Sequence, residues 1–433
     1  MQFLQLPARA DIGATIAWIN PDAAAILASS GVEPGNSTSL SSFMLEAYAF
    51  TAADAGEGRL LIDYYGSSGT TLYGGSGRAG IINSMQVKGV GRTPLTPTEA
   101  HWHHGHGRML LEEALREAVY SELAHSEFPL GAVRTLAVIE CSEEITDPAG
   151  NRHRTALLVR PFVVRACHLE RAFGFRAEES GYRRQFHRHD VSRVSAWIAQ
   201  LEFTSQPRLD AYADSMGKQI GHAHVAHWFH GGWYSSVMAL DGRLIDFGSA
   251  RRVKDWRYKP HETYGPCFGD ELRFAEATVR SLADHIKHYA STTLDVEQAL
   301  QALMGAYRQH VAEQISRQVH KAGKLDSCTT SRFYDLFTAS FQSAQRAEDH
   351  KRAVAAEIRL AEEMTSFPSD LHDARESVLN RVSYGHSQSR ERVQEHLTHL
   401  IEQCSGGRKP SSFQRGVDEL ICQLRGAIAN GAL

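Results

Sequence analysis

Three charged residues stand on elements that the hydrophobic pattern predicts, and their order constrains the fold. Lys88 follows an apolar strand and opens the run Lys-Gly-Val-Gly-Arg-Thr-Pro. Glu117 lies on the clearest helix of the first half, predicted over residues 107–125 from apolar residues at helical spacing. Asp246 follows a predicted hairpin, residues 237–245, whose central Asp-Gly is a favoured two-residue turn. A strand lysine, a helix glutamate and a carboxylate beside a tight turn favour a mixed fold in which two parts of the chain face one cleft.

The pattern changes along the chain from strands to helices. Strands are expected over residues 60–65, 81–87, 133–141 and 156–164, and mainly helices follow from about residue 190. We therefore expect an α+β fold with two lobes, a β-rich first lobe with one key helix and a mostly helical second lobe. The expected boundaries are residues 1–168 for the first lobe, 169–290 for the second lobe with its hairpin, and 291–433 for a helical C-terminal extension.

Composition argues against several classes of protein. The net charge of −4 gives no electrostatic reason to expect binding to nucleic acid or to a membrane. The N-terminus lacks a basic region followed by an apolar core, and no apolar stretch is long enough to span a bilayer. The six cysteines are scattered, which is typical of reduced thiols and not of a disulfide framework. We therefore expect a cytoplasmic protein.

A glycine-dense segment, residues 66–80, precedes the lysine strand. Its glycines allow a loop to close over a ligand, with backbone N–H groups facing phosphate oxygens and Arg78 adding further donors. A flexible hairpin loop is the simpler explanation for such a segment on its own.

For two pairs of charged residues the sequence does not decide what they contact. Alone, Lys88 or Glu117 would usually be solvated, but as a pair Glu117 would hold the Lys88 ammonium so that it points at phosphates. Arg160 and Arg165 interrupt an apolar strand, where a guanidinium needs an anion. That anion is either a nucleotide phosphate or a carboxylate of the protein itself.

Two further patterns suggest metal binding. The carboxylate of Asp246 suits Mg2+, and the glycine two residues later permits a sharp turn beside it. The chain also has 23 histidines, with groups within residues 101–106 and 222–230. Imidazoles at helical spacing can chelate a transition metal, but solvated or hydrogen-bonded histidines are the simpler account. No phosphate-loop, nucleophile-elbow or zinc-protease motif occurs in the sequence.

In this order the motifs resemble the selenoprotein O family, kinase-fold proteins that transfer AMP from ATP to protein hydroxyls. The run that begins at Lys88 is similar to that family's Lys-Gly-x-Gly-x-Thr-Pro block and is the most specific match. The resemblance covers roughly residues 15–290 and implies a protein-kinase-like fold. Supporting blocks are Asn20-Pro21, Gly75-Ser76-Gly77-Arg78-Ala79, Gly107-Arg108, Arg116-Glu117 with Ser121-Glu122, His230-Gly231 and Asp246-Phe247-Gly248.

The resemblance implies a role for each matched residue. Lys88, Glu117 and Asp246 would form the catalytic set, with Glu117 orienting Lys88 and Asp246 binding Mg2+. The nucleotide would lie inverted relative to ordinary kinases, which exposes its α-phosphate to a hydroxyl of a protein or peptide substrate. The ATP and its metal would be held by Gly75, Gly77, Arg78, Lys88, Gly107, Arg160, Arg165 and Asp246.

The chain departs from the family where the chemistry is most demanding. Where the family has Asn-Thr-Asp-Asn, this chain has Tyr-Ser-Ser-Val, so Ser236 replaces the catalytic carboxylate and Val237 the metal-binding asparagine. A serine cannot accept a proton as a carboxylate does, and a valine cannot bind a metal. Asp241 and His230 are the remaining candidate bases. Two hypotheses follow: a transferase of AMP or phosphate, or a catalytically impaired, pseudokinase-like nucleotide-binding or scaffold protein.

Overall fold

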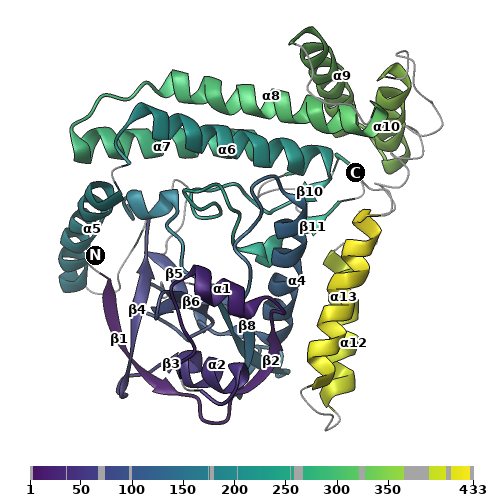
Figure 1. Cartoon of the computed structure of the whole chain (residues 1–433). Coiled ribbons are helices and arrows are strands. Elements are labelled where there is room, and N and C mark those ends of the chain that lie inside the picture. The colour runs from purple at the N-terminus through teal and green to yellow at the C-terminus, as the bar shows by residue number, and fades with distance from the viewer. Residues whose placement is uncertain are drawn as a thin grey trace.

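The computed structural model describes residues 3–35, 37–66, 74–96, 100–173, 175, 180–201, 203–253, 255–257, 267–320, 327–364, 390–405 and 411–429. These residues form one large curled antiparallel sheet, a separate two-stranded sheet and many helices (Figure 1). The α+β class that the sequence predicts is therefore confirmed.

The sheet lies in the first part of the chain. Its strands follow the order β2-β8-β9-β6-β5-β4-β1-β3, and β7 pairs with β9. Strand β6, which carries Lys88, lies between β5 and β9, where Lys88 pairs with Ala79 and Leu158. Both neighbours fix the backbone of Lys88. The strands are β1 Leu4–Ala10, β2 Thr15–Ile19, β3 Phe50–Ala52, β4 Gly58–Tyr64, β5 Gly75–Ile82, β6 Met85–Lys88, β7 Met109–Leu110, β8 Ala137–Thr146 and β9 Arg152–Pro161.

Alternation along β6 decides which way Lys88 points. Helices α1 (Ala23–Ser29) and α2 (Leu40–Tyr48) share a buried cluster with Val87, whereas α4 (Leu111–Glu127) shares another with Leu158. Successive side chains of a strand point to opposite faces of the sheet. Lys88, next to Val87 and paired with Leu158, therefore points toward α4.

The second part of the chain is mainly helical. Helices α6 and α8 pack closely, because a Cβ added at Gly217 on α6 would lie 2.2 Å from the Leu303 carbonyl oxygen on α8. None of the helices that the structure describes is both long and apolar enough to cross a membrane. The remaining elements are α3 Trp102–Gly105, α5 Ser180–Leu201, α6 Gln206–Val225, β10 Trp228–Phe229, β11 Arg251–Arg252, α7 Glu271–Ala290, α8 Val296–His320, α9 Ser327–Gln345, α10 His350–Met364, α12 Arg390–Ser405 and α13 Ser411–Ala429.

Helices α12 and α13 lie beside α4, although they are far from α4 in the sequence (Figure 1). The Trp18 indole donates to Asp418 of α13 at 2.9 Å, and the Gln414 amide bonds both backbone groups of Ile19 at 2.8 Å. Arg425 of α13 reaches the Glu122 carboxylate on α4 at 2.8 Å. These contacts tie α13 to β2 and brace α4 at Glu122.

Several sequence predictions need correction in detail. The strand expected over residues 81–87 is divided by a turn, because Asn83 and Ser84 have positive φ, β5 ends at Ile82 and β6 begins at Met85. The helix expected over residues 107–125 begins only at Leu111, because Gly107 has a positive φ of 70° and β7 follows it. The second half of the glycine segment is strand β5, whereas residues 67–73 of that segment lie outside the described residues. The strand expected to reach residue 164 ends at Pro161, so Arg165 lies beyond it.

The hairpin predicted before Asp246 forms, but its loop has three residues, 240–242, in place of the predicted two-residue Asp-Gly turn. The Ala239 N–H donates to the Arg243 carbonyl at 2.9 Å, and the Ile245 N–H donates to the Val237 carbonyl at 2.9 Å. Gly242 has a φ of 89°, which the turn requires and glycine adopts without strain. The hairpin thus places Asp246 beside α4.

Candidate functional site

A cleft of about 930 Å³ lies where the sheet, α4 and the hairpin meet. This volume lies in the range of small-molecule sites. Lys88 from β6 and Asp246 from the hairpin line it together with residues of α4. Gln394 of α12 also reaches it. The cleft is therefore assembled from several parts of the chain that are distant in sequence.

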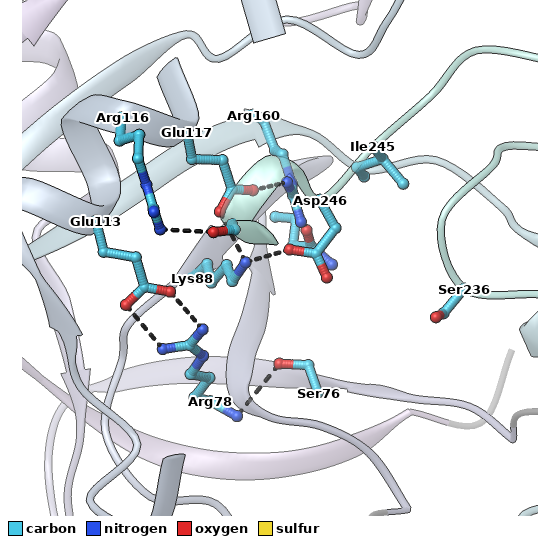
Figure 2. A network of polar contacts seen from close by, with 12 residues as sticks. Ser76, Arg78, Lys88, Glu113, Arg116, Glu117, Arg160, Ser236, Ile245 and Asp246 are labelled. Carbon is cyan, nitrogen blue, oxygen red and sulfur yellow. Dashed lines mark hydrogen bonds and ion pairs between the residues drawn. The ribbon is translucent and has the colours of Figure 1, made fainter. Parts of the chain in front are cut away.

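Lys88, Glu117 and Asp246 meet in this cleft, as the sequence predicts. The Lys88 ammonium lies 2.8 Å from the Glu117 carboxylate and also donates to Oδ1 of Asp246 (Figure 2). Glu117 is fully buried, Lys88 is 5% exposed, and the Asp246 side chain is 39% exposed. The ion pair is thus held in the wall, and the Asp246 carboxylate faces the open space.

A chain of polar groups surrounds the buried lysine. The second oxygen of Glu117 accepts from Arg160 at 2.5 Å, and Arg160 also donates to the Gln86 amide oxygen at 2.7 Å. Buried charges are tolerated only when paired and hydrogen-bonded. Each charge of this group has such a partner, so the arrangement is rigidly specified.

Asp246 is held in an uncommon state. Its φ of 71° and ψ of 69° lie in the left-handed region, which few residues other than glycine adopt and which clusters at functional sites. Burial alone would raise the pKa of the Asp246 carboxyl, but Lys88 and Arg160 hold that pKa well below its ordinary value. The carboxylate is therefore ionised across the physiological pH range.

The site fits Mg2+ only when a ligand supplies most of the oxygens. Lys88 occupies Oδ1 of Asp246, and in the described part of the chain Oδ2 has no partner. Val237, the other position considered for metal binding, is apolar. Among the described residues, no group of three or more His, Cys, Asp or Glu side chains could hold a metal ion. One carboxylate together with phosphate oxygens is a common way to hold Mg2+.

Arg78 adds a second ion pair to the cleft wall. Its guanidinium lies 2.7 Å from one Glu113 oxygen and 3.3 Å from the other. Burial raises the pKa of the Glu113 carboxyl, but Arg78 outweighs it and lowers that pKa to about 2. Arg78 thus lies on the cleft as the sequence predicts, but with a carboxylate of the protein as its partner.

Arg160 and Arg165 are paired with carboxylates of the protein, one of the two alternatives left open by the sequence. Arg165 lies 2.7 Å from Asp63, and the other Asp63 oxygen lies 2.9 Å from the His168 ring. Arg165 also donates to the Ser236 backbone carbonyl at 3.0 Å. Neither arginine is among the described residues that line the cleft.

Sequence reasoning missed Asp63. Burial opposes ionisation of this fully buried carboxyl, but Arg165 and His168 lower its pKa to about 2. An aspartate inside the apolar strand β4 was the available signal, because a buried carboxylate needs a cation.

The three glycines expected to contact phosphates have hydrogen bonds or close contacts to neighbouring parts of the chain. The Gly77 carbonyl accepts from the Thr96 hydroxyl at 2.7 Å, and the Gly107 carbonyl accepts from the Gly91 N–H at 3.1 Å. A Cβ added at Gly75 would lie 2.3 Å from the Asp63 carbonyl oxygen. They shape the strand ends around Lys88 and are not among the described lining residues.

Ser236 and Val237 line the opposite wall of the cleft. Figure 2 shows Ser236 across the open space from the Lys88–Asp246 pair. Of the two candidate bases, His230 lines the cleft, but its Nε2 donates to the Ile245 carbonyl at 3.1 Å and burial lowers its pKa. Asp241 pairs with Arg243 at 2.7 Å and lines a separate pocket with it, so it is not placed to act here.

The histidines of the second group are mostly structural. His224 contacts Tyr307 at 2.8 Å and Glu271 at 3.0 Å, and His227 contacts Glu357 at 3.1 Å. They are hydrogen-bonded core histidines, the simpler of the two accounts.

The cleft therefore has cations paired with carboxylates on one wall, and the ionised, partly exposed Asp246 carboxylate faces the open space. Such a site suits a polyanion with a divalent cation. The chain matches no protein-family model, and no curated protein matches it.

Proposed function

We propose that this protein binds ATP with Mg2+ in the cleft and transfers AMP, or a phosphate group, to a hydroxyl of a protein or peptide. The proposed scaffold is a bilobal protein-kinase-like fold similar to that of the selenoprotein O family. One observation carries the proposal: the buried Lys88–Glu117 pair lies against the partly exposed Asp246. Kinase-type folds use a strand lysine anchored by a helix glutamate, opposite a metal-binding aspartate.

The residues of the chain would act mainly by position and charge. Lys88 and Arg78 would neutralise phosphate oxygens, and Glu117 would keep Lys88 in place. Asp246 would hold Mg2+, which supplies further charge neutralisation when bound. Transfer of AMP forms a bond between the acceptor oxygen and the α-phosphorus and releases pyrophosphate. Since Ser236 is not a base, the acceptor proton would pass to water, and positioning would provide most of the acceleration.

A second candidate is a catalytically impaired nucleotide-binding protein that regulates or scaffolds a partner. The observation that favours it is the wall made by Ser236 and Val237, which provides neither a carboxylate nor an amide to the cleft. Both candidates predict ATP binding. They differ in turnover.

Two measurements test these candidates. A thermal shift with ATP and Mg2+ should show stabilisation of the wild type, because a ligand that binds only the folded state stabilises it by mass action. No shift at millimolar ATP would contradict both candidates. Incubation with ATP labelled at the α or γ position and a generic acceptor protein then separates AMP transfer, phosphorylation and inactivity. Lys88→Met is the control for label that does not depend on the cleft.

A further inference from the structure

Arg116 differs from every other buried arginine in the described part of the chain. Six such arginines each contact a carboxylate, namely Arg78, Arg160, Arg165, Arg171, Arg193 and Arg252. Arg116 is 4% exposed and contacts none. Its Nη2 donates to the Gly248 carbonyl at 2.5 Å, whereas Nε and Nη1 have no hydrogen-bond partner in the described residues.

The carboxylates nearest to Arg116 on α4 are already occupied. Glu113, one turn earlier, receives Arg78 on both of its oxygens. Glu117, the next residue, receives Lys88 on one oxygen and Arg160 on the other. Every oxygen of these two carboxylates thus already accepts from another cation, and among the described residues the Arg116 guanidinium forms no ion pair with either of them.

An unpaired buried guanidinium is costly, because arginine stays charged and its unsatisfied donors are removed from water. Arg116 lines the cleft, and Figure 2 shows its side chain extending from α4 toward the cleft. The Arg116 side chain thus lies in the wall that would face a ligand.

We infer that Arg116 is a ligand-binding residue whose guanidinium receives a phosphate group of the molecule that occupies the cleft. Phosphate is favoured over a single carboxylate because the same space is lined by cations, Arg78, Lys88 and Arg116, and by carboxylates, Glu112, Glu113 and Asp246. A phosphate group that carries Mg2+ can meet both kinds of charge. On binding, the guanidinium exchanges its bond to the neutral Gly248 carbonyl for charge-assisted bonds to the phosphate. For ATP the inference rests on the proposed function, whereas for free pyrophosphate it does not.

The test compares binding of three probes by calorimetry: ATP with Mg2+, pyrophosphate and adenosine. Arg116→Gln should weaken ATP and pyrophosphate binding about 10-fold to 100-fold, the usual range for loss of a charged hydrogen bond, and leave adenosine binding unchanged. Arg116→Lys keeps the charge and should fall between that variant and the wild type. Arg154→Gln, which breaks a pair with Glu140 on the sheet, is the control for lost stability alone.

The outcomes separate this inference from the proposed function. If the wild type and Arg116→Gln bind both phosphate probes equally well, Arg116 only ties α4 to Gly248, and the inference is overturned while ATP binding stands. If pyrophosphate binding depends on Arg116 but ATP does not bind, the inference stands and the proposed function fails. A wild type that binds neither probe overturns both. If Arg116→Gln does not fold, Arg116→Lys decides the matter by the same comparison.

Discussion

The two walls of the cleft differ in what fixes their residues. On the wall of β6 and α4, Lys88, Glu117 and Arg160 are buried and mutually paired, so loss of one leaves an uncompensated charge. On the wall of the hairpin, Ser236 and Val237 have no such partners, and a change there leaves no buried charge unpaired. The stability of the fold therefore constrains the first wall more than the second. Under the proposed function, affinity for the nucleotide and turnover would depend on different walls.

The largest effect is expected when a base and a metal-binding side chain are introduced on the wall of the hairpin. Ser236→Asp combined with Val237→Asn adds a carboxylate and an amide opposite Lys88, and a positioned base typically contributes about 10²- to 10⁴-fold in rate. We expect AMP transfer from α-labelled ATP to rise by that order. Ser236→Asn with Val237→Asn is the matched control without a base. An unchanged rate with unchanged ATP affinity would show that chemistry does not occur at this wall.

The next largest effect is expected when the ion pairs on the wall of β6 and α4 are removed. Lys88→Met leaves Glu117 with only Arg160 and removes the cation beside Asp246. We expect loss of the ATP-induced thermal shift and a decrease of about 3–5 kcal/mol in the free energy of unfolding in urea. Lys218→Met is the matched control, because Lys218 forms an exposed pair with Asp214, and it should cost about 1 kcal/mol or less. Equal losses in the two variants would mean that the Lys88 pairs are not specially stabilising.

A smaller effect concerns Asp63, which holds Arg165 and through it the backbone of Ser236. The Asp63 carboxyl has a pKa of about 2 in the folded state, below the usual value near 4. Its ionisation therefore stabilises the folded state fully above about pH 4, and this contribution is lost as pH falls toward 2. That shift corresponds to about 2 kcal/mol.

Urea unfolding at pH 5 and pH 3 should show part of this loss in the wild type and less of it in Asp63→Asn. The same acid dependence in both proteins would assign it to other carboxyls, among them Glu113.

The smallest effect tests the brace of α4 at Glu122. Arg425→Gln removes a partly exposed contact to Glu122, which Arg134 and Asn20 also hold. We expect a loss of about 1 kcal/mol in unfolding free energy. Arg415→Gln, an exposed position on the same helix, should stay within about 0.5 kcal/mol. A loss for Arg415→Gln as large as that for Arg425→Gln would argue against the brace.

The sequence predicts those parts of the site that depend on local pattern and on the order of motifs. It does not predict those that depend on contacts between distant elements. Lys88, Glu117 and Asp246 lie on elements recognisable from hydrophobic period and turn chemistry, and the structure brings them together. The burial of Arg116 was not predictable, because its cover includes the turn at Gly248, which lies 132 residues away. The partner of Arg165 was equally distant, since Asp63 is 102 residues earlier.

The brace of α4 has a consequence for the order of synthesis. The contact between Glu122 and Arg425 spans 303 residues, and that between Ile19 and Gln414 spans 395. While a ribosome is still making the helices between them, the Trp18 indole and Glu122 of α4 have no protein cover from α13. The β6 strand that carries Lys88 is thus made early, but α4 gains its last contacts only when α13 has emerged. A partly made chain would hold α4 less firmly than the finished one.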